Sequence, residues 1–126
     1  MDSYEIINYI SNSVKKTPAR IFIQGELDKI NFTGMDYFGN NEFGILFCEN
    51  NDFETLYNAN KQFIKKYKVE IDRRNSAIPL ADLTKYKARI EPGAIIRDMV
   101  EIGDNCVIMM GSVINIGAVI GEKTMI

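Results

Sequence analysis

Residues 102–126 read IGDNCVIMMGSVINIGAVIGEKTMI, and isoleucine recurs in this stretch at every sixth position. The same spacing extends upstream, so that seven positions share one residue type: Ile90, Ile96, Ile102, Ile108, Ile114, Ile120 and Ile126. The fifth position of each hexad is also restricted, to the small or β-branched residues Ala94, Val100, Cys106, Ser112, Ala118 and Thr124. A fixed period of this kind indicates a repeat architecture.

The six-residue period predicts short strands separated by corners. Side chains of a strand alternate between two faces, so an even period keeps every isoleucine on the same side. We expect positions one and five of each hexad to point inward, and positions two and six to point outward. Glycine and asparagine at position four, as at Gly93, Asn105 and Gly111, suit the left-handed backbone of a sharp corner. The pattern is typical of a parallel β-helix.

Upstream of the repeat, the sequence predicts a small α/β unit. Apolar residues at helical spacing predict helices over 3–16 and 51–67. Short apolar runs predict strands over 20–24, 43–48 and 68–72. We therefore divide the chain into an α/β domain over 1–80, a connector over 81–89 and the repeat over 90–126.

Composition narrows the class of protein. Hydrophobic residues make up 46% and charged residues 25% of 126 residues, with a net charge of −2, so neither nucleic acid nor a membrane is an expected partner. The chain has no histidine, which removes the commonest general base and metal ligand, and its cysteines, Cys48 and Cys106, lie far apart. We expect a cytoplasmic protein with no metal site.

The repeat resembles the hexapeptide-repeat acyltransferases, whose left-handed β-helix forms each triangular coil from three hexads. Two blocks, RIEPGAIIRD at 89–98 and VINIGAVIGE at 113–122, are similar to the tetrahydrodipicolinate N-acetyltransferases of bacterial lysine biosynthesis. The similarity continues upstream through 72–88 into the α/β unit, and it departs at Lys123, where that family usually has glycine. The resemblance implies an α/β unit followed by a left-handed parallel β-helix of about two coils.

The resemblance also implies an activity. The expected reaction transfers an acetyl group from acetyl-CoA to the amine of ring-opened tetrahydrodipicolinate (2-amino-6-oxopimelate) in the diaminopimelate and lysine pathway. Acetyl-CoA is then a co-substrate, no bound cofactor is expected, and the full-length enzyme is a homotrimer with sites between neighbouring subunits. Two alternatives stay open: a succinyl-CoA-dependent sister enzyme, and a non-catalytic scaffold that only mediates trimerisation.

The repeat ends on a core residue, Ile126, with no polar cap. Because solenoid repeats do not bury their core alone, we expect an incomplete β-helix that is inactive by itself. In the related succinyltransferases, an aspartate thought to be catalytic follows a stretch similar to 124–126. The catalytic residue is therefore expected after Ile126, and the sequence assigns that role to none of Glu91, Glu101 and Glu122.

Three hexads per coil place residues eighteen apart one above another, so Arg97 lies over Asn115. We select these two as candidate substrate-binding residues, because a guanidinium can clamp a substrate carboxylate or a coenzyme A phosphate. The alternative is that Arg97 only pairs with Glu101 on the solvent side.

Two outward strips are candidates for the trimer contact. The first strip is apolar and rich in glycine, and comprises Gly103, Val107, Gly121 and Met125. A closed three-fold ring needs a second, different patch on each subunit. For this patch we select Glu91, Ile95, Met109 and Val113.

Overall fold

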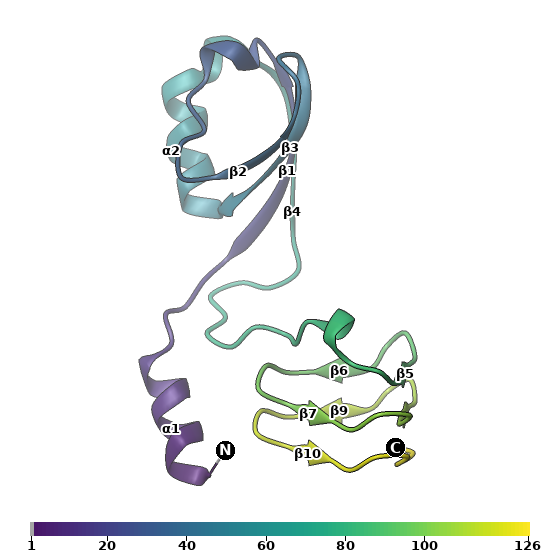
Figure 1. Ribbon diagram of the computed structural model, residues 1–126. Helices are drawn as coiled ribbons and strands as arrows, with labels where there is room; N and C mark the ends of the chain where they lie inside the picture. The colour runs from purple at the N-terminus through teal and green to yellow at the C-terminus, as the bar shows by residue number, and fades with distance from the viewer. Residues whose placement is uncertain (1) are drawn as a thin grey trace. The chain divides into compact units, whose positions relative to one another are not determined.

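The computed structural model describes residues 2–126 and divides them into two compact units (Figure 1). One unit comprises 15–76, and the other comprises 2–14 together with 77–126. Each unit has its own hydrophobic core.

The unit of 15–76 is a four-stranded antiparallel sheet with one α-helix against it. The strand order is β2 (Asp36–Gly39), β3 (Phe43–Glu49), β1 (Pro18–Gly25) and β4 (Ile64–Ile71). Helix α2 (Asn50–Asn60) covers one side of the sheet (Figure 1). The core of this unit contains the buried side chains Ala19, Ile21, Ile23, Leu27, Ile30, Leu46, Phe53 and Leu56.

Two of the predicted strands, over 20–24 and 43–48, are confirmed by β1 and β3. The helix predicted over 51–67 is wrong beyond Asn60, where a 3₁₀ turn over Lys61–Phe63 follows and β4 begins. The cause is strand pairing, since β4 runs antiparallel to β1 over nearly its whole length. A second 3₁₀ turn, over Leu27–Lys29, and the short strand β2 have no counterpart among the predicted elements.

The repeat forms stacked turns of two-residue parallel strands. Strand β5 (Arg89–Ile90) pairs with β8 (Val107–Ile108), and β6 (Ile95–Ile96) pairs with β9 (Val113–Ile114). Likewise β7 (Glu101–Ile102) pairs with β10 (Val119–Ile120), and a single parallel bridge joins Val107 to Met125. In every pair residue i lies beside residue i+18, so three hexads make one turn, as predicted.

The inward positions are largely those expected from the period. Buried side chains at positions one and five are Ile96, Val100, Ile102, Cys106, Ile108 and Ile114. The last turn differs, because Thr124 is exposed and Ile126 retains 41% of its surface. Among residues 90–126 the apolar interior is therefore most complete around Ile108, whose exposed fraction is 0%.

The fourth position of every hexad is a left-handed corner. The φ angles are 88° at Gly93, 84° at Gly111 and 85° at Gly117, and the same region holds Met99 at 60°, Asn105 at 64° and Lys123 at 58°. Lys123 thus adopts the corner geometry that glycine has elsewhere, although an L side chain is strained in this region.

Lys123→Gly should raise the free energy of unfolding by about 1 kcal/mol. The left-handed conformation costs an L-residue roughly 1–2 kcal/mol, and the larger unfolded-state entropy of glycine offsets part of that gain. The control is Glu122→Gly, at a neighbouring position outside the left-handed region, which should lower stability instead. Urea melts of both variants measure the difference, and equal shifts would contradict the assignment of strain to position 123.

The grouping of outward residues is wrong in one respect. The strands run from position six of one hexad to position one of the next, so a flat face joins positions on either side of an isoleucine. Gly103 consequently shares a face with Glu101, and a left-handed corner at Asn105 separates it from Val107. By the same rule Arg97 shares a face with Ile95, whereas the corner at Met99 separates it from Glu101.

Helix α1 (Ser3–Asn12) belongs to the same unit as the repeat. The Asp2 side chain caps its start by accepting a hydrogen bond from the Glu5 amide at 2.8 Å. The helix ends four residues earlier than predicted, because Ser13 is extended and its amide bonds to the Ile10 carbonyl.

The contacts divide the chain differently from the expected boundaries at 80 and 90. The segment before the repeat pairs with its first turn, since the Ala81 amide donates to the Ile96 carbonyl at 2.9 Å. The Asp98 amide donates to the Pro79 carbonyl at 3.0 Å, and Leu80 forms an antiparallel bridge with Arg97. Ala81 is buried with the isoleucines of the repeat. Residues 79–81 thus lie along the outer edge of β6.

Candidate functional site

Arg97 lies between two backbone neighbours at the end of β6. Residues 79–81 run along one edge of this strand, and β9 pairs with the other. The Arg97 amide donates to the Ile114 carbonyl at 3.0 Å, which fixes the position of Asn115 one turn away. The arginine side chain is half-buried, and Asn115 is exposed.

The structure brings the two candidate residues together. Arg97 Nη1 donates a hydrogen bond to Asn115 Oδ1 at 3.2 Å. The same oxygen accepts from the Ile116 amide at 2.8 Å, so the asparagine side chain is held against its own backbone. The eighteen-residue spacing predicts that Arg97 lies over Asn115, and the structure adds the hydrogen bond between them.

The alternative pairing of Arg97 with Glu101 does not occur. Among the described residues, no carboxylate lies within ion-pair distance of Arg97, since the ion pairs join Arg20 to Glu70, Lys29 to Glu26, Arg73 to Asp72, and Arg89 to Glu91. A guanidinium has five N–H donors, and one of them is directed to Asn115. The remaining donors suit a planar anion such as a carboxylate.

A second polar contact, which sequence reasoning missed, lies beside this pair. The Tyr9 hydroxyl of α1 donates to Asp98 Oδ2 at 2.7 Å. This hydrogen bond, with partial desolvation and the negative charge of Asp98, raises the pKa of Tyr9 above its ordinary value of 10.0. Its contribution to stability is therefore complete below about pH 10 and is lost as the pH rises through the higher pKa of the folded state.

The other ionisable groups named from sequence are dispersed. Glu91 pairs with Arg89 at 3.1 Å, and Glu101 and Glu122 are exposed. Cys106 is buried, and burial together with nearby Asp52 and Glu49 raises the pKa of the Cys48 thiol. Residues 2–126 contain no group of three or more cysteine, aspartate and glutamate side chains placed to hold a metal ion.

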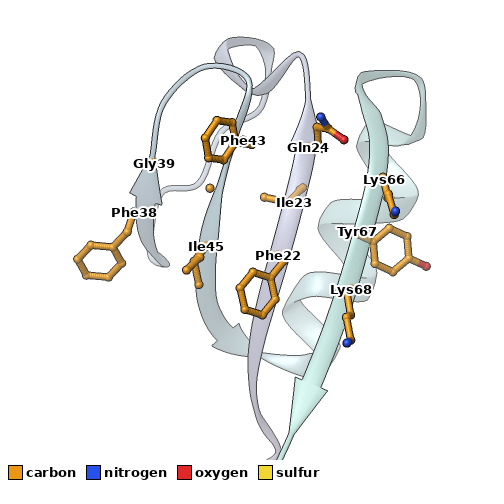
Figure 2. Close-up of a pocket in the computed structure, with 11 residues that line it drawn as sticks. Phe22, Ile23, Gln24, Phe38, Gly39, Phe43, Ile45, Lys66, Tyr67 and Lys68 are labelled. Atoms are coloured by element: carbon orange, nitrogen blue, oxygen red, sulfur yellow. The ribbon is translucent and has the colours of Figure 1, made fainter.

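The sheet unit carries a separate apolar hollow of about 560 Å³ (Figure 2). It lies on strands β1 to β4, and its lining includes Phe22, Phe38, Phe43, Ile45 and Lys68. The lining residues include two lysines and one glutamine but no carboxylate, thiol or hydroxyl other than that of Tyr67. This composition suits binding of an apolar surface more than proton transfer.

No helix within the described part of the chain has the length and apolarity needed to cross a membrane.

Comparisons with known proteins agree on one family. The sequence model described as "Tetrahydrodipicolinate succinyltransferase N-terminal" matches residues 1–83. Three similar relatives are 2,3,4,5-tetrahydropyridine-2,6-dicarboxylate N-acetyltransferases. The protein of Petrotoga mobilis is 62% identical over 112 residues (89% of this chain, 48% of the relative). The protein of Thermosipho africanus is 60% identical over 110 residues (87% and 47%), and that of Halalkalibacterium halodurans is 58% identical over 118 (93% and 49%).

The chain spans about half the length of the curated relatives that it matches. Within that span the identities confirm the resemblance inferred from the blocks at 89–98 and 113–122. The match over 1–83 covers the sheet unit and the helix α1, so it does not depend on the hexad pattern. The chain therefore belongs to the family described as tetrahydrodipicolinate succinyltransferase N-terminal.

Proposed function

We propose that the protein carrying this chain transfers an acetyl group from acetyl-CoA to the amine of ring-opened tetrahydrodipicolinate in diaminopimelate and lysine biosynthesis. The observation that carries the proposal is 58–62% identity to three relatives named as N-acetyltransferases of this dicarboxylate. The cytoplasm is the proposed site of this pathway step. Acetyl-CoA is a co-substrate in this scheme, and no resident cofactor is invoked.

The acyl donor separates this proposal from its nearest alternative. The family description names a succinyltransferase, whereas the three relatives are named acetyltransferases. The test is thiol release by the protein as its gene encodes it, with tetrahydrodipicolinate and either acetyl-CoA or succinyl-CoA. Faster release from acetyl-CoA supports the proposal, and faster release from succinyl-CoA overturns it. Release from neither donor favours the non-catalytic scaffold.

We propose a left-handed β-helix as the architecture of 90–126. Its support is the eighteen-residue turn of three parallel strands and the left-handed corner in each of the six hexads. The resemblance to hexapeptide-repeat acyltransferases supplies the handedness. The division into an α/β domain over 1–80, a connector over 81–89 and the repeat over 90–126 stays a proposal about domains, beside the contact-based units described above.

Arg97 is the proposed anchor for a carboxylate of the substrate, and Asn115 is the residue that orients it. The substrate carries two carboxylates, and the donors of Arg97 not directed to Asn115 match one of them. The proton acceptor for the amine is not assigned, because none of Glu91, Glu101 and Glu122 lies within ion-pair distance of Arg97 among the described residues.

Arg97→Gln should raise KM for the dicarboxylate at least tenfold, because it removes a charge-assisted hydrogen bond to the substrate. Asn115→Ala should have a smaller effect in the same direction, since it removes only the orienting contact. Arg89→Gln is the matched control, because Arg89 is exposed and pairs with Glu91 on another face. Steady-state kinetics of the three variants provide the test. An unchanged KM in Arg97→Gln would remove this residue from the site.

Gly121→Arg should weaken the proposed homotrimer while leaving the turns folded. A side chain at Gly121 has room on its own chain, since the nearest atom to an added Cβ is Thr124 Oγ1 at 4.0 Å. In a trimer whose contact includes this face, the added charge would be desolvated. Light scattering measures the assembly, and Met110→Arg at an exposed corner is the control. A trimer of undiminished stability in Gly121→Arg would place the contact elsewhere.

A further inference from the structure

One face of the sheet in 15–76 is apolar and open. Helix α2 covers the opposite face, so residues of each strand alternate between the core and the open side. The large side chains on the open side are 40–64% exposed, and they are Phe22, Phe38, Phe43 and Phe47. Phe38 and Phe47 contact each other edge to face, with ring centroids 5.8 Å apart.

The register of the strands arranges this open face in three rows. Residues opposite each other in an antiparallel pair point to the same side. The central row contains Phe38, Ile45, Phe22 and Lys68. The row on one side of it contains Phe43, Gln24 and Lys66. The row on the other side contains Asp36, Phe47, Arg20 and Glu70. Figure 2 shows Phe22, Ile45 and Lys68 on three neighbouring strands.

The open faces of two copies of this chain can be laid against each other so that most of the residues in these rows meet a suitable partner. A two-fold axis can relate two stacked sheets if it lies midway between them, perpendicular to the strands and above the central row. This axis places the central row of one copy over the central row of the other, and it places each outer row over the opposite outer row. Phe43 then faces Phe47, Gln24 faces Arg20, and Lys66 faces Glu70, twice in each complex. The phenylalanines of the outer rows meet, and Lys66 and Glu70 bring opposite charges together. In the central row each residue faces its own copy, so Lys68 faces Lys68 at the β4 edge.

The other in-plane axis, parallel to the strands, gives a poor match. It places β2 of one sheet over β4 of the other, so Asp36 faces Glu70 in the same row and Lys68 faces Phe38. Like charges in an interface disfavour association. The first axis brings together two opposite-charge pairs and one like-charge pair, whereas this axis brings together two like-charge pairs, so charge favours the first arrangement.

We propose that the open sheet face docks a second copy of this chain about the axis perpendicular to the strands. Two aligned sheets pack about 10 Å apart with their side chains interdigitated, which removes the phenylalanines of both copies from water. The contact is isologous, so each residue pair occurs twice. The proposal does not depend on the acetyl-transfer activity, because it involves only the sheet unit.

Charge exchange across the contact supplies the test. Lys66→Glu replaces the opposite-charge pair with Glu70 by a like-charge pair in both of the symmetry-related contacts. The dissociation constant of the complex should therefore rise at least tenfold. Glu70→Lys places lysine opposite Lys66 and should weaken association similarly. An equimolar mixture of the two variants should associate again, because the mixed pair restores two opposite-charge contacts. Sedimentation velocity and light scattering of the 126-residue chain over the micromolar range measure each case.

Two controls keep the result interpretable. Lys65→Glu makes the same charge change on the adjacent, exposed residue of β4, which lies outside the three rows at the point where the register with β1 shifts. It should associate like the parent chain. Glu70→Lys also breaks the 2.7 Å pair with Arg20, so its melting temperature is measured to show that the sheet is intact.

Three outcomes would overturn the proposal. If Lys65→Glu and Lys66→Glu associate equally, the charge row is not in the contact. If the mixture associates no better than its components, the two-fold arrangement is wrong. If the parent chain does not associate through this face, Phe22→Glu will leave the measured molecular mass unchanged at every concentration. Another partner or another segment then covers the face.

Discussion

Replacing Ile108 with aspartate should unfold the repeat unit. Ile108 has 0% of its surface exposed, and it stacks on Ile90 in the parallel pair of β5 and β8. A carboxylate at that place would have no partner, because the surrounding buried side chains are the apolar ones of this core. Burying an unpaired charge costs several kcal/mol, which is a large part of the 5–15 kcal/mol that typically stabilises a domain.

The matched control is Val113→Asp. Val113 is also a β-branched residue on a two-residue strand, but it sits at position six, points outward and is 70% exposed. A surface substitution of this kind changes stability by only about 0.5 kcal/mol. Hydrogen exchange followed by NMR resolves the effect by residue. In Ile108→Asp the amides of 89–120 should lose protection while those of β1 and β3 retain it, since the sheet unit has its own core.

If both units of Ile108→Asp keep their amide protection, the inward assignment of position one is wrong. If both lose it together, the two units fold as one cooperative block.

The repeat was predictable because its six-residue period determines on which face of each strand the isoleucine lies. Seven isoleucines six residues apart fix one face of every strand, and this face supplies most of the buried side chains; Ile116, at the third position, is buried without being predicted, and Ile126 is exposed despite the period. The corners were predictable from glycine and asparagine at position four, and Lys123 adopts the same conformation although its residue type argues against it. Backbone pairing on both sides of this corner overrides the preference of a single residue, as the bond from its amide to the Asp104 carbonyl shows.

The outward faces were less predictable, since the period does not fix where a strand starts within the hexad. Hydrogen bonds place each strand across the boundary between hexads. A shift of this kind leaves the inward residues unchanged and reassigns only the neighbours of the outward ones. Gly103 and Val107 were therefore separated, whereas Arg97 and Asn115 stayed together because they differ by one full turn.

The predicted strand over 68–72 matches only the second half of β4, and the first half was assigned to the preceding helix. Lys65, Lys66 and Lys68 make β4 strongly charged, so its alternation is weak in the sequence, and the apolar spacing of Phe53 and Leu56 continues through Phe63 as if the helix went on. Pairing with β1 decides the conformation instead. The Tyr9–Asp98 hydrogen bond was also not predicted, because 89 residues separate the two partners and no repeat relates them.

Gly103→Ala should lower the free energy of unfolding by about 2 kcal/mol, the middle of the range for overpacking a tight contact. A Cβ at this position would lie 2.6 Å from the Glu122 amide nitrogen and 2.8 Å from Glu122 Cα. Both atoms belong to the backbone of the next turn, which the bond from the Gly103 amide to the Ile120 carbonyl holds at 2.8 Å. Neither can move away without lengthening that bond.

Gly121→Ala is the matched control, because Gly121 occupies the same hexad position one turn later and an added Cβ would come no closer than 4.0 Å to Thr124 Oγ1. Neither glycine has a left-handed φ, so backbone strain is the same for both substitutions. Gly121→Ala should be neutral or slightly stabilising, since alanine loses less entropy on folding. Urea melts measure both variants. Equal melts would mean that the next turn yields to the methyl group at no cost, whereas the expected gap would show that Gly103 is required for stacking within one chain, independently of any contact between subunits.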